Sequence, residues 1–216
     1  MQELVLEGNP SLIIQIMKRH SSNKDAQSHG CAALAGLMVE EDETKDSIVS
    51  AGGIEAVIQA MQTHPQSADV QQHGCAALIH VNVGDEKAND KIASAGGIEA
   101  VVKAMQTHTQ SADVQLHGCA ALTLIHMVGD EANERIVSAG GIEAVVEAMQ
   151  THTQNAQVQV KGCAVLCILA DSQTKIKSRI ASAGAIEAVV KAMQTHPQNA
   201  GVQNDARAAL DRLYRL

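Results

Sequence analysis

The tetrad Met61-Gln62-Thr63-His64 recurs at a fixed interval along the chain. Copies stand at residues 105–108, 149–152 and 193–196, and a degenerate copy, Met17-Lys18-Arg19-His20, precedes them. Each copy begins 44 residues after the previous one, and one glycine column and one cysteine column keep the same interval. A period of this length is typical of repeat proteins, whose units are too small to bury an apolar face alone. The sequence therefore predicts a continuous stack of similar units.

Each unit is predicted to contain three helices. Apolar residues between positions 53 and 65 fall at i, i+3, i+4 and i+7, the stripe of an amphipathic helix. The pair Gly52-Gly53 indicates the end of a shorter helix before it. A longer third helix is expected after the following loop, because a Ser or Asn column stands where the first free amides need an acceptor. That column consists of Asn23, Ser67, Ser111, Asn155 and Asn199.

Composition and length favour one repeat domain without an internal boundary. The chain has 216 residues, is 45% hydrophobic and lacks Phe and Trp, so aliphatic residues, Met, Ala and Cys must fill the core. Linear stacking requires no linker, and a single domain over residues 1–216 is predicted. The expected units are approximately 1–38, 39–82, 83–126, 127–170 and 171–216.

Charge and cysteine usage point to a cytoplasmic protein, with the nucleus as the alternative. A formal net charge of −8 argues against nucleic-acid or anionic-membrane partners, which select clustered Lys and Arg. The start is acidic where a signal peptide would be basic, and no apolar run is long enough to span a membrane. Four of the five cysteines form a column with one member per unit, too far apart for disulfides, so buried free thiols are expected.

The repeat resembles the armadillo repeat. The similarity lies in the stretch Ile136-Val137-Ser138-Ala139-Gly140-Gly141-Ile142-Glu143-Ala144-Val145-Val146, in Val158-Gln159, and in the Gly-Cys-Ala-x-Leu run at 162–166. It covers nearly the whole chain in five registered copies. The resemblance implies an all-α, right-handed armadillo-like α-solenoid of about five three-helix repeats. It also implies that the third helices line a concave groove that holds other proteins.

The chain departs from the peptide-binding members of that family. Those members carry a Trp and, four residues later, an Asn along the third helix, and the Asn clamps the bound peptide backbone. The aligned Trp column here is Ala32, Ala76, Ala120, Ala164 and Ala208. The aligned Asn column is Gly36, His80, Leu124, Ile168 and Arg212. Both halves of the clamp are missing, so recognition of nuclear localisation signals by that mechanism is not expected.

Polar residues on the third helix are the candidate contacts for a partner. Asp69 and His73 stand four residues apart on one helix face, as do Asp25 with His29 and Asp113 with His117, so each pair is predicted to interact and to raise the His pKa. A solvated polar face is the alternative role. The predicted groove residues are Asp25, His29, Asp69, His73, Ala76, His80, Asp113, His117, Ala120, Lys161, Ala164 and Arg212.

No catalytic centre, cofactor or metal is predicted. Asp69, His73 and His80 offer too few close ligands for a metal. The other His column, which ends each middle helix, is expected to interact with the helix dipole and to cap free carbonyls. No phosphate loop, zinc motif or nucleophile elbow occurs in the sequence. The column members are His20, His64, His108, His152 and His196.

The predicted function is that of a protein-binding scaffold. The alanine floor suggests that a guest protein or peptide supplies the bulky side chains. A monomer is expected, with a homo-oligomer as the alternative. The competing function is a structural or self-associating solenoid segment within a larger assembly. Arg207 occupies the cysteine column in the last copy, so the stack is expected to end there, with Arg207 exposed.

Overall fold

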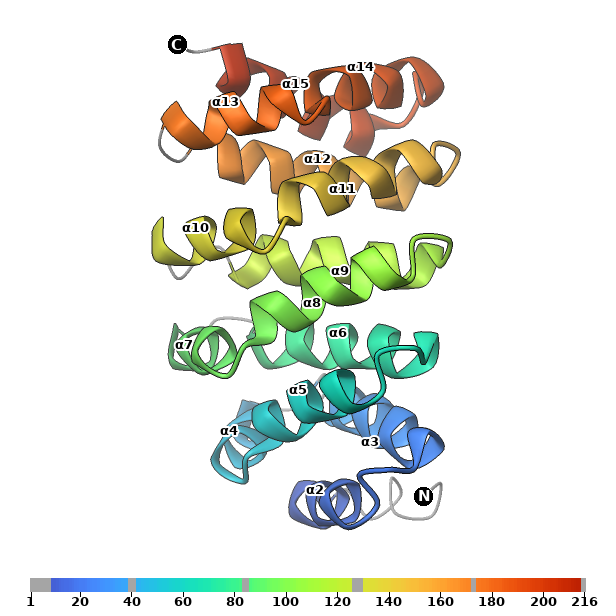
Figure 1. The fold of residues 1–216 in the computed structure, drawn as a ribbon, viewed down its shortest axis with the longest axis vertical. Coiled ribbons are helices and arrows are strands. Elements are labelled where there is room, and N and C mark those ends of the chain that lie inside the picture. Colours follow the sequence, from blue (N-terminus) through green and yellow to red (C-terminus); the bar gives the residue numbers. More distant parts are fainter. Residues whose placement is uncertain (1–8, 39–41, 83–85, 126–129, 172–173, 215–216) are drawn as a thin grey trace.

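The described part of the chain is entirely helical. A computed structural model describes residues 9–38, 42–82, 86–125, 130–171 and 174–214, which form 14 α-helices and no strand. The helices follow one another as layers from one end of the molecule to the other (Figure 1). They are α2 (Pro10–Arg19), α3 (Lys24–Leu37), α4 (Asp42–Ser50), α5 (Gly53–Thr63), α6 (Ala68–Asn82), α7 (Glu86–Ser94), α8 (Gly97–Thr107), α9 (Ala112–Ile125), α10 (Asp130–Ser138), α11 (Gly141–Thr151), α12 (Ala156–Ala170), α13 (Thr174–Ser182), α14 (Ala185–Thr195) and α15 (Ala200–Tyr214). The predicted all-α solenoid is confirmed.

A glycine pair turns the chain from each short helix into the middle helix. Gly96 has φ +83°, in the left-handed region that favours glycine, and it lies between α7 and α8. A Cβ on Gly97 would stand 2.5 Å from Cγ2 of Ile92, so the second glycine permits close packing of the two helices. The same left-handed geometry recurs at Gly52, Gly140 and Gly184. The bend predicted from the sequence is therefore present.

The Ser or Asn column begins the third helices as predicted. Oδ1 of Asn155 accepts hydrogen bonds from the backbone amides of Gln157 and Val158, at 3.1 and 3.2 Å. Asn23 caps α3 in the same way, with both distances 3.0 Å. These bonds satisfy amides that have no partner within the helix.

The third helices make the main contacts between layers. They pack directly on one another from layer to layer, more extensively than the middle helices α5, α8, α11 and α14 do. In Figure 1 the short helices α4, α7, α10 and α13 lie along one edge, and the middle helices lie in front of the third helices. The closer packing of the third helices supports the prediction that they line the concave side of the superhelix.

Small residues let the helices of one unit approach closely. A Cβ on Gly74 would stand 2.5 Å from Cγ of Met61, and the same Gly and Met contact recurs at Gly30, Gly118 and Gly162. The cysteines beside these glycines are free and buried, as predicted. Burial raises the pKa of each thiol to about 12 at Cys31, Cys75, Cys119 and Cys163. Such thiols stay protonated at neutral pH and act as small apolar residues.

A glutamine in each third helix, buried in every unit except the last, fastens the helix to the end of the middle helix. Nε2 of Gln115 donates to the carbonyl oxygens of Met105 and His108, both at 2.9 Å. Gln71 makes the equivalent bonds to Met61 and His64, at 3.0 and 2.9 Å. The sequence analysis did not identify this role. Each glutamine satisfies two carbonyls that a helix C-terminus leaves free.

The histidine column at the ends of the middle helices joins neighbouring units. Nε2 of His108 lies 2.8 Å from the carbonyl oxygen of Pro65, in the loop one unit earlier, and a carbonyl acceptor requires the proton on Nε2. His152 contacts the carbonyl of Thr109 in the same way, at 2.8 Å. The prediction placed these residues correctly at the helix ends. It was wrong about the rings, which bond to the preceding unit and do not cap their own helix.

Candidate partner-binding groove

The predicted groove residues lie on the third helices α3, α6, α9, α12 and α15. We call the solvent-facing side of these helices the groove face. All five alanines in the position of the missing Trp are half-buried, so the face is low and apolar along its centre. They are Ala32, Ala76, Ala120, Ala164 and Ala208.

The Asp and His pairs do not form as predicted. Nδ1 of His29 donates to the backbone carbonyl of Asp25 at 2.6 Å, and Nδ1 of His117 donates to the backbone carbonyl of Asp113 at 2.7 Å. In each case the acceptor is the backbone oxygen four residues earlier and not the carboxylate. This bond requires the proton on Nδ1, so Nε2 of the neutral ring is left as an acceptor facing outward.

His73 and His80 also differ from the prediction. Nδ1 of His73 lies 3.0 Å from Oγ of Ser28 in the neighbouring α3. Burial lowers the pKa of His73, and the attraction of Asp69 only partly offsets that effect. Burial likewise lowers the pKa of His80, with smaller contributions from His117 and Lys45. The predicted rise in the His73 pKa is therefore wrong, because desolvation outweighs the nearby carboxylate.

A pocket on the groove face brings four predicted residues together. His80, His117, Ala120 and Lys161 contribute to it, from α6, α9 and α12, and its volume is about 460 Å³. We call it the groove pocket. Three half-buried aliphatic side chains complete its apolar wall, and the sequence analysis did not identify them: Ile79, Leu116 and Val160. The remaining predicted residues lie outside this pocket, on α3, α6, α9, α12 and α15: Asp25, His29, Asp69, His73, Ala76, Asp113, Ala164 and Arg212.

The basic residues of the groove face differ in how they are used. Nε of Arg212 lies 2.5 Å from Oδ2 of Asp171, and Nη1 of Arg212 lies 3.0 Å from Sγ of Cys167. Lys161 is exposed and makes no hydrogen bond or ion pair within the part of the chain that the structure describes. Burial raises the pKa of Asp205, and the charge of Lys161 opposes that rise without an ion pair between them. Lys161 is therefore the cation available to a guest at the groove pocket.

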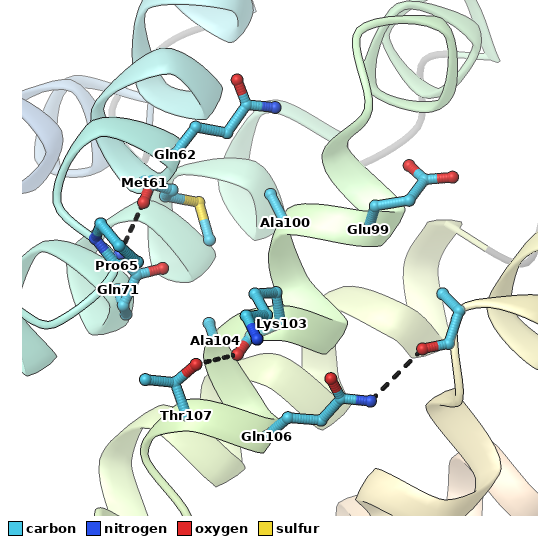
Figure 2. Close-up of a pocket in the computed structure, with 11 residues that line it drawn as sticks. Met61, Gln62, Pro65, Gln71, Glu99, Ala100, Lys103, Ala104, Gln106 and Thr107 are labelled. Atoms are coloured by element: carbon cyan, nitrogen blue, oxygen red, sulfur yellow. Dashed lines mark hydrogen bonds between the residues drawn. The ribbon is translucent and has the colours of Figure 1, made fainter.

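A second pocket lies on the opposite side, between the middle helices α5 and α8, and we call it the outer pocket. Its volume is about 560 Å³, and Met61, Ala100 and Ala104 line its floor (Figure 2). Most of the polar groups around it already have partners. The side chain of Gln106 donates to the carbonyl of Ala139, and Glu99 pairs with Arg135 at 2.8 Å.

The described residues offer neither a metal site nor a membrane span. Within the described ranges, no three His, Cys, Asp or Glu side chains are grouped so that they could hold a metal ion. Among the described helices, none is long and apolar enough to cross a membrane.

Comparisons with known proteins agree on the repeat type. The family model described as LRRK2 ARM repeat matches residues 94–215. No relative among curated proteins matches the chain.

Solved structures give the same result. The crystal structure of an engineered protein matches with a TM-score of 0.80 and 27% identity, over 98% of this chain and 82% of that one. A designed armadillo repeat protein in complex with the peptide (KR)4 matches with a TM-score of 0.79 and 20% identity, over 98% and 84% of the two chains. The armadillo repeats only protein from Plasmodium falciparum matches with a TM-score of 0.72 and 17% identity, over 86% and 79%.

Proposed function

Because the chain belongs to the armadillo (ARM) repeat family, we propose that its groove face binds a segment of another protein. One observation carries the proposal. The third helices present a strip of half-buried alanines that leads into an apolar pocket of about 460 Å³. Covering such a surface with a guest removes apolar area from water, which is the dominant favourable contribution to association.

The mode of binding follows from the missing Trp and Asn columns. The designed armadillo protein of similar fold is described in complex with a peptide, which supports peptide binding as a role for this architecture. Alanines in this chain leave space where larger side chains would stand. We infer that the guest fills that space with its own bulky side chains, while polar residues such as His73 and His117 contact its backbone.

We assign the groove face no catalytic role. The thiol nearest the alanine floor in each unit is buried, and its pKa of about 12 at Cys75 and Cys119 excludes a thiolate nucleophile near neutral pH. The imidazoles at His29 and His117 donate to backbone carbonyls of their own helices, which orients them without any partner nucleophile. Binding is the chemistry that these groups can support.

Selection from a displayed library of random peptides tests the proposal. The affinity of selected peptides would be measured for the wild type, for a groove variant and for an outer-face variant. The groove variant carries His73→Glu and His117→Glu. The outer-face variant carries Gln59→Glu and Gln62→Glu, both exposed on α5, and it changes the net charge by the same amount. Circular dichroism would establish equal helix content in all three proteins.

Weaker binding by the groove variant alone is the expected result. A loss of about tenfold, equivalent to 1.4 kcal/mol, would match the removal of a few polar contacts. Equal affinities for the two variants would place binding elsewhere and overturn the proposal. Sedimentation over a range of concentrations tests the competing role. If the mass of the wild type rises with concentration while the groove variant stays a monomer, the groove face would be a self-association surface.

A further inference from the structure

The groove pocket combines an apolar wall with one positive charge. Its wall is formed by the aliphatic side chains of Ile79, Leu116 and Val160, and its side toward the alanine floor is formed by Ala120. Lys161 stands at the rim, and no carboxylate contributes to the lining. Such a pocket favours an apolar side chain inside and an anionic group at the rim.

The ammonium group of Lys161 is available to a ligand. It makes no hydrogen bond or ion pair among the described residues, whereas Arg212 on the neighbouring helix is already paired with Asp171. Asp205 is the carboxylate whose pKa burial raises and the charge of Lys161 lowers, but the two side chains form no ion pair. A guest carboxylate that reached Lys161 would gain a partner without breaking an existing bond.

Neighbouring polar groups suit a peptide. Nδ1 of His117 is already engaged with the carbonyl of Asp113, so Nε2 of the neutral ring can accept from a guest amide. Gln157 also lines the pocket. Its backbone amide donates to the side chain of Asn155, and its side-chain amide has no partner among the described residues. These groups can hydrogen-bond the backbone of an apolar residue seated in the pocket.

We propose that the groove pocket recognises a peptide segment in which a bulky apolar residue stands next to an acidic residue. The inference deepens the proposed function and rests on it. A basic residue at the same place would put like charge beside Lys161. A purely apolar segment would pack against the wall of the pocket but leave the ammonium group of Lys161 without a counter-charge. The acidic and apolar pair uses both features.

Two capped dipeptides test the inference directly. One probe is N-acetyl-phenylalanyl-glutamate amide, and the other is the matched glutamine peptide, which differs only in replacing the carboxylate by an amide. Methyl resonances of Ile79, Leu116 and Val160 would report occupancy of the pocket during NMR titration at neutral pH. The glutamate probe is expected to bind about fivefold more tightly, the upper range for an exposed ion pair. Raising the salt concentration should reduce that preference.

Two lysine variants separate the role of the pocket from general charge. Lys161→Gln should abolish the preference for the glutamate probe while leaving the affinity for the glutamine probe unchanged. Lys103→Gln, at the outer pocket on the opposite face, removes the same charge and should leave the preference intact. Both lysines are exposed, so neither change disturbs the core.

The outcomes distinguish this inference from the proposed function. Equal affinity for the two probes, or shifts that map to the outer pocket, would overturn the acidic and apolar specificity even if library peptides bind the groove face. Failure of the library selection together with a Lys161-dependent preference would overturn the protein-binding role while leaving the pocket chemistry intact. A preference that survives Lys161→Gln would also overturn the inference, because no other unpaired cation lies among the described residues that line the pocket.

Discussion

Replacing Gln115 by alanine should destabilise the fold more than any surface change of the same size. The side chain is 1% exposed, and its Nε2 donates to two carbonyl oxygens at the end of α8, both at 2.9 Å. Truncation leaves both carbonyls without a partner, that of Met105 in a buried site and that of His108 in a part-buried site. An unsatisfied buried group costs about 1–3 kcal/mol. Because the His108 carbonyl is only part-buried, we expect a loss of about 2–4 kcal/mol in the free energy of unfolding.

Urea unfolding followed by far-ultraviolet circular dichroism measures this loss. The matched control is Gln157→Ala, an exposed glutamine of the neighbouring third helix, which should change stability by no more than about 0.5 kcal/mol. Repeat arrays can unfold in steps, so the slope with urea must be compared as well as the midpoint. If Gln115→Ala cost less than about 1 kcal/mol at an unchanged slope, the glutamine would not be what fastens α9 to α8.

Three further predictions concern stability: one changes the pH dependence of unfolding, and two compare a pair of substitutions that should have different effects. Because burial places the folded-state pKa of His73 below 6.5, its stabilising contribution is present above pH 6.5 and is lost as pH falls through the lower folded value. His73→Gln should flatten this loss in unfolding free energies measured between neutral and acidic pH. Gly36→Ala, where an added Cβ meets nothing within 4 Å, should stabilise α3 by about 0.5 kcal/mol, whereas Gly96→Ala, at φ +83°, should destabilise by about 1–2 kcal/mol. Thermal melting would compare the two. Cys119→Arg should cost at least about 3 kcal/mol because it buries an unpaired charge, and exposed Arg207→Cys should stay within about 0.5 kcal/mol. Equal melting temperatures for the two variants would contradict the assignment of Arg207 to the same repeat position as Cys119.

The sequence was sufficient for the elements that depend on local chemistry. The 44-residue period, the apolar stripe and the Ser or Asn column predicted helices and caps that the structure confirms. Gly52-Gly53 was correctly placed after a short helix, because a left-handed residue there requires glycine. Each of these features depends on residues within one or two helical turns, and the repeats present the same pattern several times.

Features that depend on contacts between elements were missed or misassigned. Gln71 reads as an ordinary polar residue in the sequence, yet the structure buries it against the end of α5, ten residues earlier. His108 was placed at the correct helix end, but its ring bonds to Pro65, 43 residues away. A pattern along one helix cannot show which carbonyls of another helix lack partners. For the same reason the aliphatic wall at Leu116 was not anticipated, since three separate helices build it.

Comparing equivalent positions in the five repeats distinguishes residues needed for stacking from residues available for recognition. Two positions that join helices stay the same along the chain: the fastening glutamine is Gln in all five units, and the bend glycine remains in the left-handed region wherever it is described. The column one turn before the alanine floor is instead His, His, His, Lys and Asp along the chain, from His29 to Asp205. Stacking imposes the same requirement on each unit and so keeps its residues alike. A position that stays at least partly exposed on every copy is less constrained, so its charge can change along the groove face. Within this column Lys161 is the only cation, and no described residue pairs with it, so we expect charge recognition in the part of the groove face that includes the groove pocket.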